Sequence, residues 1–205
     1  MKYTDSTNLF LKQRLFSHKN TSSNVFIVIE GPSGTGKTTA TKLLAKRLRA
    51  IDLHSPPKEL LPIRQFIDNS DLEVQFLYYL TGNVITSRQV TTQLENTSIV
   101  LDRYVFTTAA WFSSLEVNVQ VDFLSLNLLQ PDFLFLLVTK DEKVRRDRVR
   151  AEDRSFTASD SMLETIPGIQ QRCLSLFRSF HPIEIDTTDK TVEEIVTLIE
   201  TILRE

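Results

Sequence analysis

Glycine and cysteine are scarce in this sequence, which has five glycines and one cysteine among 205 residues. The single Cys173 excludes a disulfide framework within the chain and a cysteine-based zinc site. Because Cys173 lies in a segment with apolar periodicity, we expect a small core residue rather than a reactive thiol. The low cysteine content fits a reducing compartment, and we expect a cytoplasmic protein.

Long apolar runs and a dominant charge are also absent. No run reaches 18 apolar residues, and the N-terminal segment lacks the uninterrupted apolar stretch of a signal peptide. The formal net charge of −2 provides no overall electrostatic attraction to nucleic acid or to an anionic membrane. We therefore expect a small-molecule partner, and neither a nucleic acid polymer nor a membrane.

Predicted strands and helices alternate along the chain. Short apolar runs predict buried strands at residues 24–30, 98–102, 131–139 and 182–186, and the segment 52–62 is a loop or a short irregular strand. Helices are predicted at residues 38–51, 71–96, 107–129, 141–154, 159–180 and 191–205. This alternation predicts an α/β fold, with a doubly wound parallel sheet of five strands flanked by helices.

The polar N-terminal segment predicts an extension over residues 1–23, followed by one domain over residues 24–205. Within the extension, apolar residues predict a short amphipathic helix that docks on the domain, formed around Phe10, Leu11, Leu15 and Phe16. Gly82 marks a candidate kink in the long helix at residues 71–96.

Three of the five glycines lie in one stretch of thirteen residues, "IVIEGPSGTGKTT" at 27–39. The stretch satisfies G-x-x-x-x-G-K-[ST] and stands between a predicted strand and a predicted helix, as a phosphate-binding loop requires. In such a loop Lys37 reaches the β- and γ-phosphates of ATP, and the Thr38 hydroxyl binds Mg²⁺. We expect the cofactor site to comprise Gly31, Pro32, Ser33, Gly34, Thr35, Gly36, Lys37, Thr38 and Thr39.

The second predicted strand ends in Asp102-Arg103-Tyr104, beside the expected phosphate loop. A carboxylate at this end of a strand can hold Mg²⁺ through water or orient Lys37, and the adjacent Arg103 can clamp an anionic acceptor. The alternative is a surface ion pair that follows a strand.

Five arginines lie within ten residues, which is more than an amphipathic helix needs: Arg145, Arg146, Arg148, Arg150 and Arg154. They suit a mobile lid that closes over the phosphates and offsets the charge on the transferred phosphoryl group. The alternative is a solvated face balanced by the neighbouring acidic residues.

Taken in order, four segments resemble thymidylate kinases: "FIVIEGPSGTGKTT", "LDRYVFTTAAWF", "PDFLFLLVTKDEKVRRDRVRAEDR" and "IEIDTTDKTVEEIVTLI". The resemblance runs from the first strand to the last helix. It implies a P-loop NTPase fold with a helical lid at about residues 141–156. It also implies transfer of the ATP γ-phosphoryl group to a nucleoside monophosphate, with Mg²⁺. Related kinases are often dimers, and a homodimer is expected by that analogy.

The resemblance also implies roles for individual residues. Arg103 contacts the acceptor, Asp102 organises the Mg²⁺ or phosphate region, and Trp111 supplies an aromatic ring for stacking on a base. The lid arginines stabilise the transition state, with Arg148, Arg150 and Arg154 as candidates.

Acceptor recognition departs from the family pattern. The loop positions Pro32–Thr35 carry no acidic residue, and no arginine stands in "LHSPPKELLP" after the first helix. The acceptor-binding Asp-Arg of the family would fall near Leu80–Thr81, where no charge stands, and Arg88 is two turns further on.

Two alternatives therefore stay open beside a monophosphate kinase. A deoxynucleoside or other hydroxyl kinase would use Glu30 as a base on a neutral acceptor. An NTP-binding regulatory module would hold the nucleotide without a dedicated acceptor. The candidate substrate-binding residues are Glu30, Arg88, Arg103, Tyr104 and Trp111, with Arg64 and Asn83 as further pocket candidates.

Overall fold

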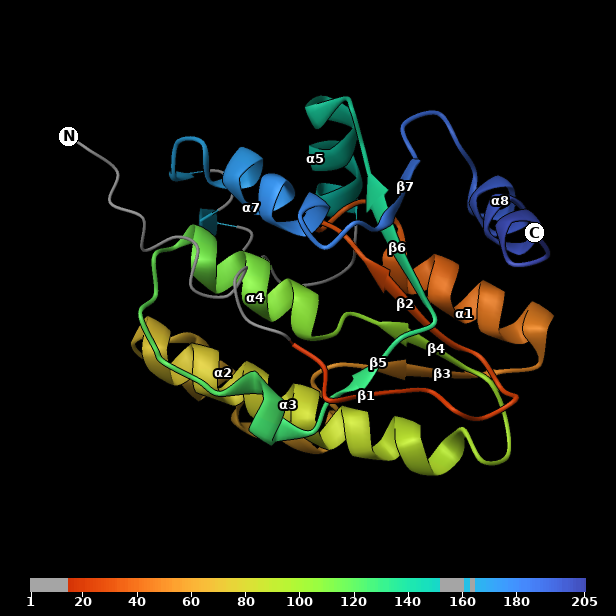
Figure 1. Ribbon diagram of the computed structural model, residues 1–205. Coiled ribbons are helices and arrows are strands. Elements are labelled where there is room, and N and C mark those ends of the chain that lie inside the picture. The colour runs from red at the N-terminus through yellow and green to blue at the C-terminus, as the bar shows by residue number, and fades with distance from the viewer. Residues whose placement is uncertain (1–14, 152–160, 163–164) are drawn as a thin grey trace.

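The computed structural model describes residues 15–151, 161–162 and 165–205 as an α/β structure (Figure 1). The predicted alternation of strands and helices is confirmed over these residues. The elements, with η for 3₁₀ helices, are β1 His18–Lys19, β2 Phe26–Glu30, α1 Lys37–Leu48, β3 Ile51–His54, η2 Lys58–Leu60, α2 Leu61–Asp68, α3 Leu72–Gln93, β4 Ile99–Asp102, α4 Val105–Ser114, η3 Phe123–Leu126, β5 Leu129–Gln130, β6 Phe133–Val138, α5 Glu142–Ala151, α7 Ile169–Arg178, β7 Ile183–Asp186 and α8 Val192–Ile202.

Five parallel strands form the central sheet in the order β3-β4-β2-β6-β7. The central strand β2 is buried along all five of its residues, because β4 and β6 pair with its edges and helices cover its faces. Val28 is opposite Leu101 on one side and Leu134 on the other. The continuous apolar run at this position is thus the pattern of a strand buried on both faces.

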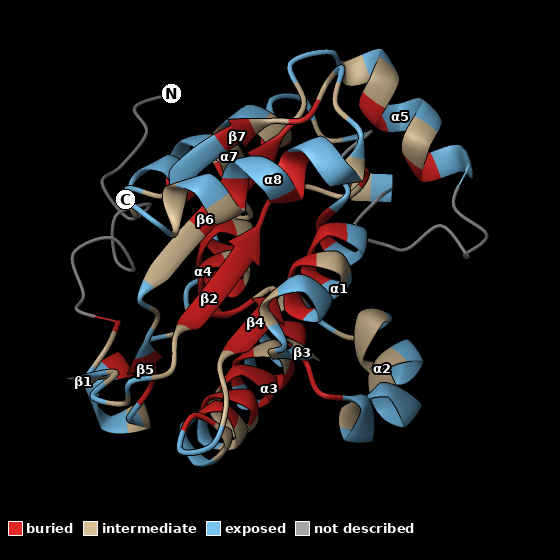
Figure 2. Cartoon of the chain, turned by 90° about the vertical axis from the view of Figure 1, so that its right-hand side faces the viewer, coloured by how far each residue is buried: buried red, intermediate tan, exposed pale blue. Residues whose placement is uncertain are grey.

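Helices cover both faces of the sheet, as Figure 2 shows by the buried strands between exposed outer helix surfaces. Alternate residues of β2 point to opposite faces. Ile27 and Ile29 pack in the cluster that includes Leu44 of α1 and Ile199 of α8. The side chains on the other face join a larger cluster with residues of α3, α4 and α7. The doubly wound parallel sheet predicted from the sequence is confirmed.

Two predictions for the helices after the phosphate loop differ in the structure. The helix expected over 107–129 is shorter, because α4 ends at Ser114 and Glu116 adopts a left-handed backbone (φ 59°), and the 3₁₀ helix η3 and β5 follow it. Gly82 marks no break, since α3 runs without interruption from Leu72 to Gln93. A Cβ at Gly82 would lie 2.7 Å from the Cβ of Pro56, so glycine serves a close approach of the segment after β3.

The segment before β2 packs on the domain. Leu15 is buried in the larger core cluster, Phe16 packs against it, and β1 pairs in parallel with β5. The predicted docking is present for these residues, but their backbone is not helical. The packed chain thus reaches back at least to Leu15, before the predicted domain start at residue 24, and Phe10 and Leu11 lie outside the described residues.

The parallel arrangement brings the carboxyl ends of β2, β3 and β4 to the same edge of the sheet. The loops after these strands meet there, which is where open α/β sheets bind ligands. Among the described residues, no helix combines the length and the apolar character needed to cross a bilayer.

Candidate active site

The predicted phosphate loop connects β2 to α1, and its glycines fit tight places. A Cβ on Gly31 would lie 2.1 Å from the carbonyl oxygen of Leu137, and Gly31 has a φ of +141°. A Cβ on Gly34 would lie 2.6 Å from the carbonyl oxygen of Arg145, and its φ is +82°. Only glycine satisfies both conditions, because other residues rarely adopt such backbones and would clash. α1 begins directly after the loop, at Lys37, so its N-terminus faces the loop.

The two polar side chains at the start of α1, Lys37 and Thr38, both form hydrogen bonds within the site. Lys37 is buried, and its Nζ donates a 2.6 Å hydrogen bond to the carbonyl oxygen of Pro32. The Thr38 hydroxyl donates a 2.5 Å hydrogen bond to Oδ2 of Asp102, at the end of β4. The structure thus brings together Lys37, Thr38 and Asp102, as the sequence predicts.

Asp102 is 2% exposed, and its carboxylate lies among cationic groups. Burial opposes ionisation, but the hydrogen bond with His54 and the charges of Lys37 and Arg103 hold the pKa of Asp102 well below its usual range. His54 Nδ1 lies 3.5 Å from Oδ2. The other oxygen, Oδ1, is buried without a hydrogen-bond partner among the described residues. An ionised oxygen left in this way is a candidate ligand for a cation or its water.

These groups fit Mg²⁺. Among the described residues, no three or more His, Cys, Asp or Glu side chains form a metal cluster. Mg²⁺ does not need one, because it is usually held by one or two carboxylates, waters and substrate phosphates. Asp102 Oδ1 and the hydroxyl of Thr38 are the protein oxygens that fit it here.

Arg103 is held in a left-handed backbone conformation (φ 67°), which is uncommon for a residue with a side chain. Neighbouring contacts fix this turn: Arg103 N donates to the carbonyl oxygen of Ile29, and Tyr104 N donates to Glu30 Oε1 over 2.8 Å. Its guanidinium reaches the Thr107 hydroxyl over 3.3 Å and lines the cavity. A cation is thereby placed beside the phosphate loop.

Glu30 was predicted as a substrate contact, but the structure does not bring its carboxylate to the cavity. The side chain is fully buried and accepts hydrogen bonds from the backbone of Tyr104 and Thr107 and from the Thr107 hydroxyl. Burial raises the pKa of Glu30 to about 7, although these hydrogen bonds and the charge of Arg103 oppose the rise. Glu30 therefore fixes the start of α4 rather than a ligand.

Tyr104 borders the cavity, but its hydroxyl turns into the core. It donates a 3.3 Å hydrogen bond to the carbonyl oxygen of Leu129, and the ring packs against Phe16 and Phe26. Its role in the fold therefore differs from the predicted contact with substrate.

One cavity of about 310 Å³ extends from the phosphate loop to α3, α4 and α7. Its walls beyond the loop include His54, Ser55, Arg64, Tyr79, Asn83, Arg103, Thr108, Trp111, Phe112, Gln170 and Cys173. The structure thus places Trp111, Arg64 and Asn83 at the cavity. Cys173 borders it but is buried, and burial raises the pKa of its thiol to about 12, so the thiol stays neutral.

Arg88 does not reach the cavity. It is exposed, and it does not belong to the residues that line the site. It is five positions after Asn83, which places it ~140° around α3 from Asn83, because a helix has 3.6 residues per turn. In this structure Arg88 therefore does not take the place of the acceptor-binding arginine that the family has on this helix.

Arg64 supplies a cation at the cavity, on α2. Its Nε donates to Oδ2 of Asp68 over 3.3 Å, and the hydroxyl of Tyr79 donates to Oδ1 of the same carboxylate over 2.9 Å. Burial raises the pKa of Tyr79 to about 12, so the hydroxyl remains a donor at neutral pH. The sequence offers Arg64 as a pocket candidate without predicting a helix there, and only the fold places it on α2 beside α3.

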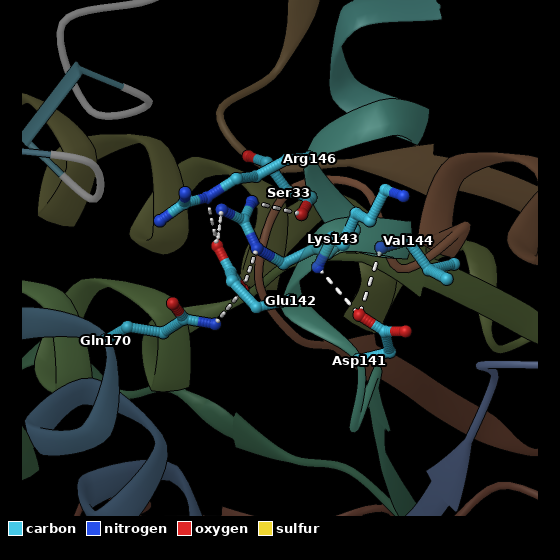
Figure 3. Close-up of polar contacts among 8 residues, drawn as sticks. Ser33, Asp141, Glu142, Lys143, Val144, Arg146 and Gln170 are labelled. Carbon is cyan, nitrogen blue, oxygen red and sulfur yellow. Dashed lines mark hydrogen bonds and ion pairs between the residues drawn. The ribbon is translucent and has the colours of Figure 1, made fainter.

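The arginine run begins on α5, where Arg145, at 3% exposed, is the most enclosed of the members that the structure describes. Its guanidinium donates to both oxygens of Glu142 and, over 3.0 Å, to the carbonyl oxygen of Ser33 in the phosphate loop. Gln170 of α7 donates to the same Glu142 carboxylate, and Figure 3 shows Gln170 beside Glu142. Arg145 thus connects α5 to the phosphate loop.

The predicted transition-state arginines have different positions. Arg148 donates to the carbonyl oxygens of Thr187 and Thr188 over 2.8 and 3.0 Å, which fastens α5 to the loop after β7. Arg150 is exposed. Arg154 and the end of the predicted lid, residues 152–156, lie outside the described residues. In this structure neither Arg148 nor Arg150 lines the cavity.

Comparisons with known proteins find kinases of nucleoside monophosphates, which agrees with a phosphate loop and a cavity beside it. The Thymidylate kinase family model matches residues 29–199. The chain is 31% identical over 181 residues to a probable thymidylate kinase of Methanocaldococcus jannaschii, a match that covers 84% of this chain and 92% of the relative. It is 25% identical to UMP-CMP kinase 2, mitochondrial, of Homo sapiens, over 85% of this chain and 42% of that protein. A solved thymidylate kinase structure from Candida albicans has a TM-score of 0.67 at 17% identity, covering 90% of this chain and 93% of that one.

The family match spans most of the chain and confirms the resemblance carried by the phosphate loop and Asp102-Arg103-Tyr104. The similarity to the Candida albicans structure confirms the fold. The hydroxyl kinase and the regulatory module are less consistent with these matches. The chain belongs to the thymidylate kinase family, whose reaction class is ATP-dependent phosphoryl transfer to a nucleoside monophosphate.

Proposed function

We propose that this protein transfers the γ-phosphoryl group of ATP to a pyrimidine nucleoside monophosphate. The observation that carries the proposal is that one continuous cavity joins the phosphate loop, Arg103 and an aromatic end with Trp111. Donor phosphates, acceptor phosphate and acceptor base can therefore lie in one continuous space. The relatives named above act, by their names, on pyrimidine monophosphates, which supports the choice of base.

ATP binds with its phosphates on the loop from Gly31 to Thr38. The backbone N–H groups and the start of α1 attract the phosphates, and Lys37 moves from the Pro32 carbonyl to the β- and γ-oxygens. Thr38 and Asp102, the latter directly or through water, would hold Mg²⁺, and a bound ion would neutralise charge on the ATP phosphates.

The acceptor phosphate binds at Arg103, where the left-handed turn places the guanidinium beside the loop, 3.5 Å from the carbonyl oxygen of Gly31, and at the cavity. The base lies between the aromatic residues and α3, with Trp111 available for stacking. The oxygen of a phosphate monoester is already an anion near neutral pH, so the acceptor needs no strong base. This agrees with the position of Glu30, whose carboxylate is engaged by Tyr104 and Thr107.

In this proposal Arg148 acts at the transition state only after α5 moves, because its guanidinium is bonded to the loop after β7. The homodimer and the cytoplasmic location stay predictions from the sequence.

A coupled assay of ADP release tests the proposal. ADP should form with dTMP, UMP, CMP or their deoxy forms, at least tenfold faster than with the corresponding nucleosides or with small alcohols. Faster turnover with nucleosides would favour the hydroxyl kinase instead. ADP release that is the same with and without any acceptor would favour the regulatory module.

A further inference from the structure

The amide of Asn83 is suspended between two hydroxyl groups at the cavity wall. The Ser55 hydroxyl donates to Asn83 Oδ1 over 2.8 Å, and Asn83 Nδ2 donates to the Thr108 hydroxyl over 2.7 Å. The three side chains come from the residue after β3, from α3 and from α4, and all three are buried and line the cavity. Nothing else among the described residues bonds to this amide.

Each neighbour of the amide is both a donor and an acceptor, because a hydroxyl has one proton and two lone pairs. If the amide turns by 180°, Nδ2 donates to Ser55 and the Thr108 hydroxyl donates to Oδ1. The same number of hydrogen bonds is made in both orientations. The buried environment therefore holds the plane of the amide firmly without fixing which end is oxygen.

One lone pair of Oδ1 and one N–H of Nδ2 remain for a ligand in either orientation. Uracil and thymine present an N3–H donor beside the O4 acceptor, whereas cytosine presents the N3 acceptor beside an N4–H donor. These two edges are each other's inverse. An amide that pairs with one edge pairs with the other after a half turn.

We propose that Asn83, held between Ser55 and Thr108, is a reversible reader that lets one acceptor pocket take both keto (uracil or thymine) and amino (cytosine) pyrimidine monophosphates. The inference rests on the proposed function, and it adds that Asn83 determines the breadth of acceptor choice. Ser55 and Thr108 act through Asn83 and are positioning residues.

The experiment compares acceptors that differ only in the base, namely dUMP with dCMP and UMP with CMP. The quantity measured is kcat/KM for each, and the keto-to-amino ratio within a pair cancels any effect of the sugar. The wild-type ratio is expected to lie within about tenfold of one, because each orientation makes the same hydrogen bonds. A ratio beyond tenfold in either direction would overturn the proposal.

Removing one hydroxyl should bias the amide. In Ser55→Ala the amide keeps Nδ2 on Thr108, since a buried N–H without a partner is less tolerated than a carbonyl without one. In Thr108→Val the same preference turns Nδ2 toward Ser55. The two variants should shift the keto-to-amino ratio in opposite directions, each by about fivefold. Shifts in the same direction, or no shift in either variant, would contradict a reversible amide.

Thr108→Ser is the matched control, because it keeps the hydroxyl and should keep the wild-type ratio. A binding measurement on the wild type does not depend on whether a variant folds. Trp111 is the only tryptophan in the chain and lines the cavity, so its fluorescence reports the binding of dUMP and dCMP. Similar affinities for the two are expected, and affinities that differ more than tenfold overturn the inference. If no pyrimidine monophosphate is phosphorylated, the proposed function itself fails; turnover of only one base class defeats the reader alone.

Discussion

Thr38 and Asp102 are 64 positions apart in sequence, yet the Thr38 hydroxyl donates a 2.5 Å hydrogen bond to Asp102 Oδ2. The bond joins the start of α1 to the end of β4 and leaves Oδ1 buried without a partner among the described residues. An ionised carboxylate with one oxygen bonded and the other without a partner can bind a cation or a water of that cation.

Asp102→Asn keeps the size and the hydrogen bond from Thr38 but removes the charge. We expect kcat to fall by roughly 10²–10³ and half-maximal activity to need more Mg²⁺, because the metal loses its ionised ligand. A Mg²⁺ titration at saturating ATP and acceptor measures both. Asp52→Asn is the control, on the exposed strand β3. An unchanged Mg²⁺ requirement in Asp102→Asn would remove Asp102 from the metal site.

Arg103→Ala should raise the KM for the acceptor monophosphate by roughly tenfold to a hundredfold, because a charge-assisted contact with the acceptor phosphate is lost. The KM for ATP should change little. Steady-state kinetics with each substrate varied in turn separates the two. The comparison variant is Arg88→Ala, since Arg88 is exposed and away from the cavity. If Arg103→Ala weakened ATP alone, the acceptor role would be wrong.

The phosphate loop, Asp102 and Arg103 could be predicted because each belongs to a short motif next to a recognisable strand. In the phosphate loop the backbone N–H groups bind the phosphates, and three glycines within thirteen residues indicate such a loop. The parallel sheet could be predicted equally well, since strands buried on both faces are continuous apolar runs in the sequence.

The acceptor end could not be predicted in the same way. The partners of Asn83 lie 28 and 25 residues away in sequence, so its environment depends on how β3, α3 and α4 pack. Asn83 and the exposed Arg88 likewise lie on different faces of α3, and only the packing of the helix shows which face borders the cavity. In the arginine run all members share one charge pattern, and only the fold distinguishes Arg145, which is buried and bonds to the carbonyl of Ser33, from the exposed Arg146.

Arg145→Ala and Arg146→Ala form a matched pair, because both arginines bind Glu142 but only Arg145 is buried and reaches Ser33. Arg145→Ala should lower the free energy of unfolding by about 3 kcal/mol, since Glu142 and the Ser33 carbonyl lose an enclosed partner. Arg146→Ala should cost less than about 1 kcal/mol. Urea unfolding measures both, and equal losses would show that the buried connection has no special weight.

Glu30 makes stability depend on pH. Burial raises its pKa from 4.5 to about 7, so between these values the folded chain keeps a proton that the unfolded chain has released. The contribution is therefore full below about pH 4.5 and is lost as pH rises through 7. It amounts to about 3 kcal/mol across this window. Glu30→Gln has no such proton.

Urea unfolding of the wild type and of Glu30→Gln at several pH values between about 4.5 and 8 measures this effect. The free energy of unfolding of the wild type should fall relative to that of the variant as pH rises. Parallel curves for the two proteins would show that Glu30 is ionised in the folded state throughout.

The most direct test follows the phosphoryl group itself. ATP labelled with ³²P at the γ-position is mixed with excess enzyme and a pyrimidine nucleoside monophosphate in a single turnover, with Lys37→Ala as the inactive comparison and Lys42→Ala, exposed on the same helix, as the active one. The label should appear in the β-phosphate of the pyrimidine diphosphate with the wild type and Lys42→Ala, and not with Lys37→Ala. Label released only as inorganic phosphate, or transferred equally well by Lys37→Ala, would contradict phosphoryl transfer at this site.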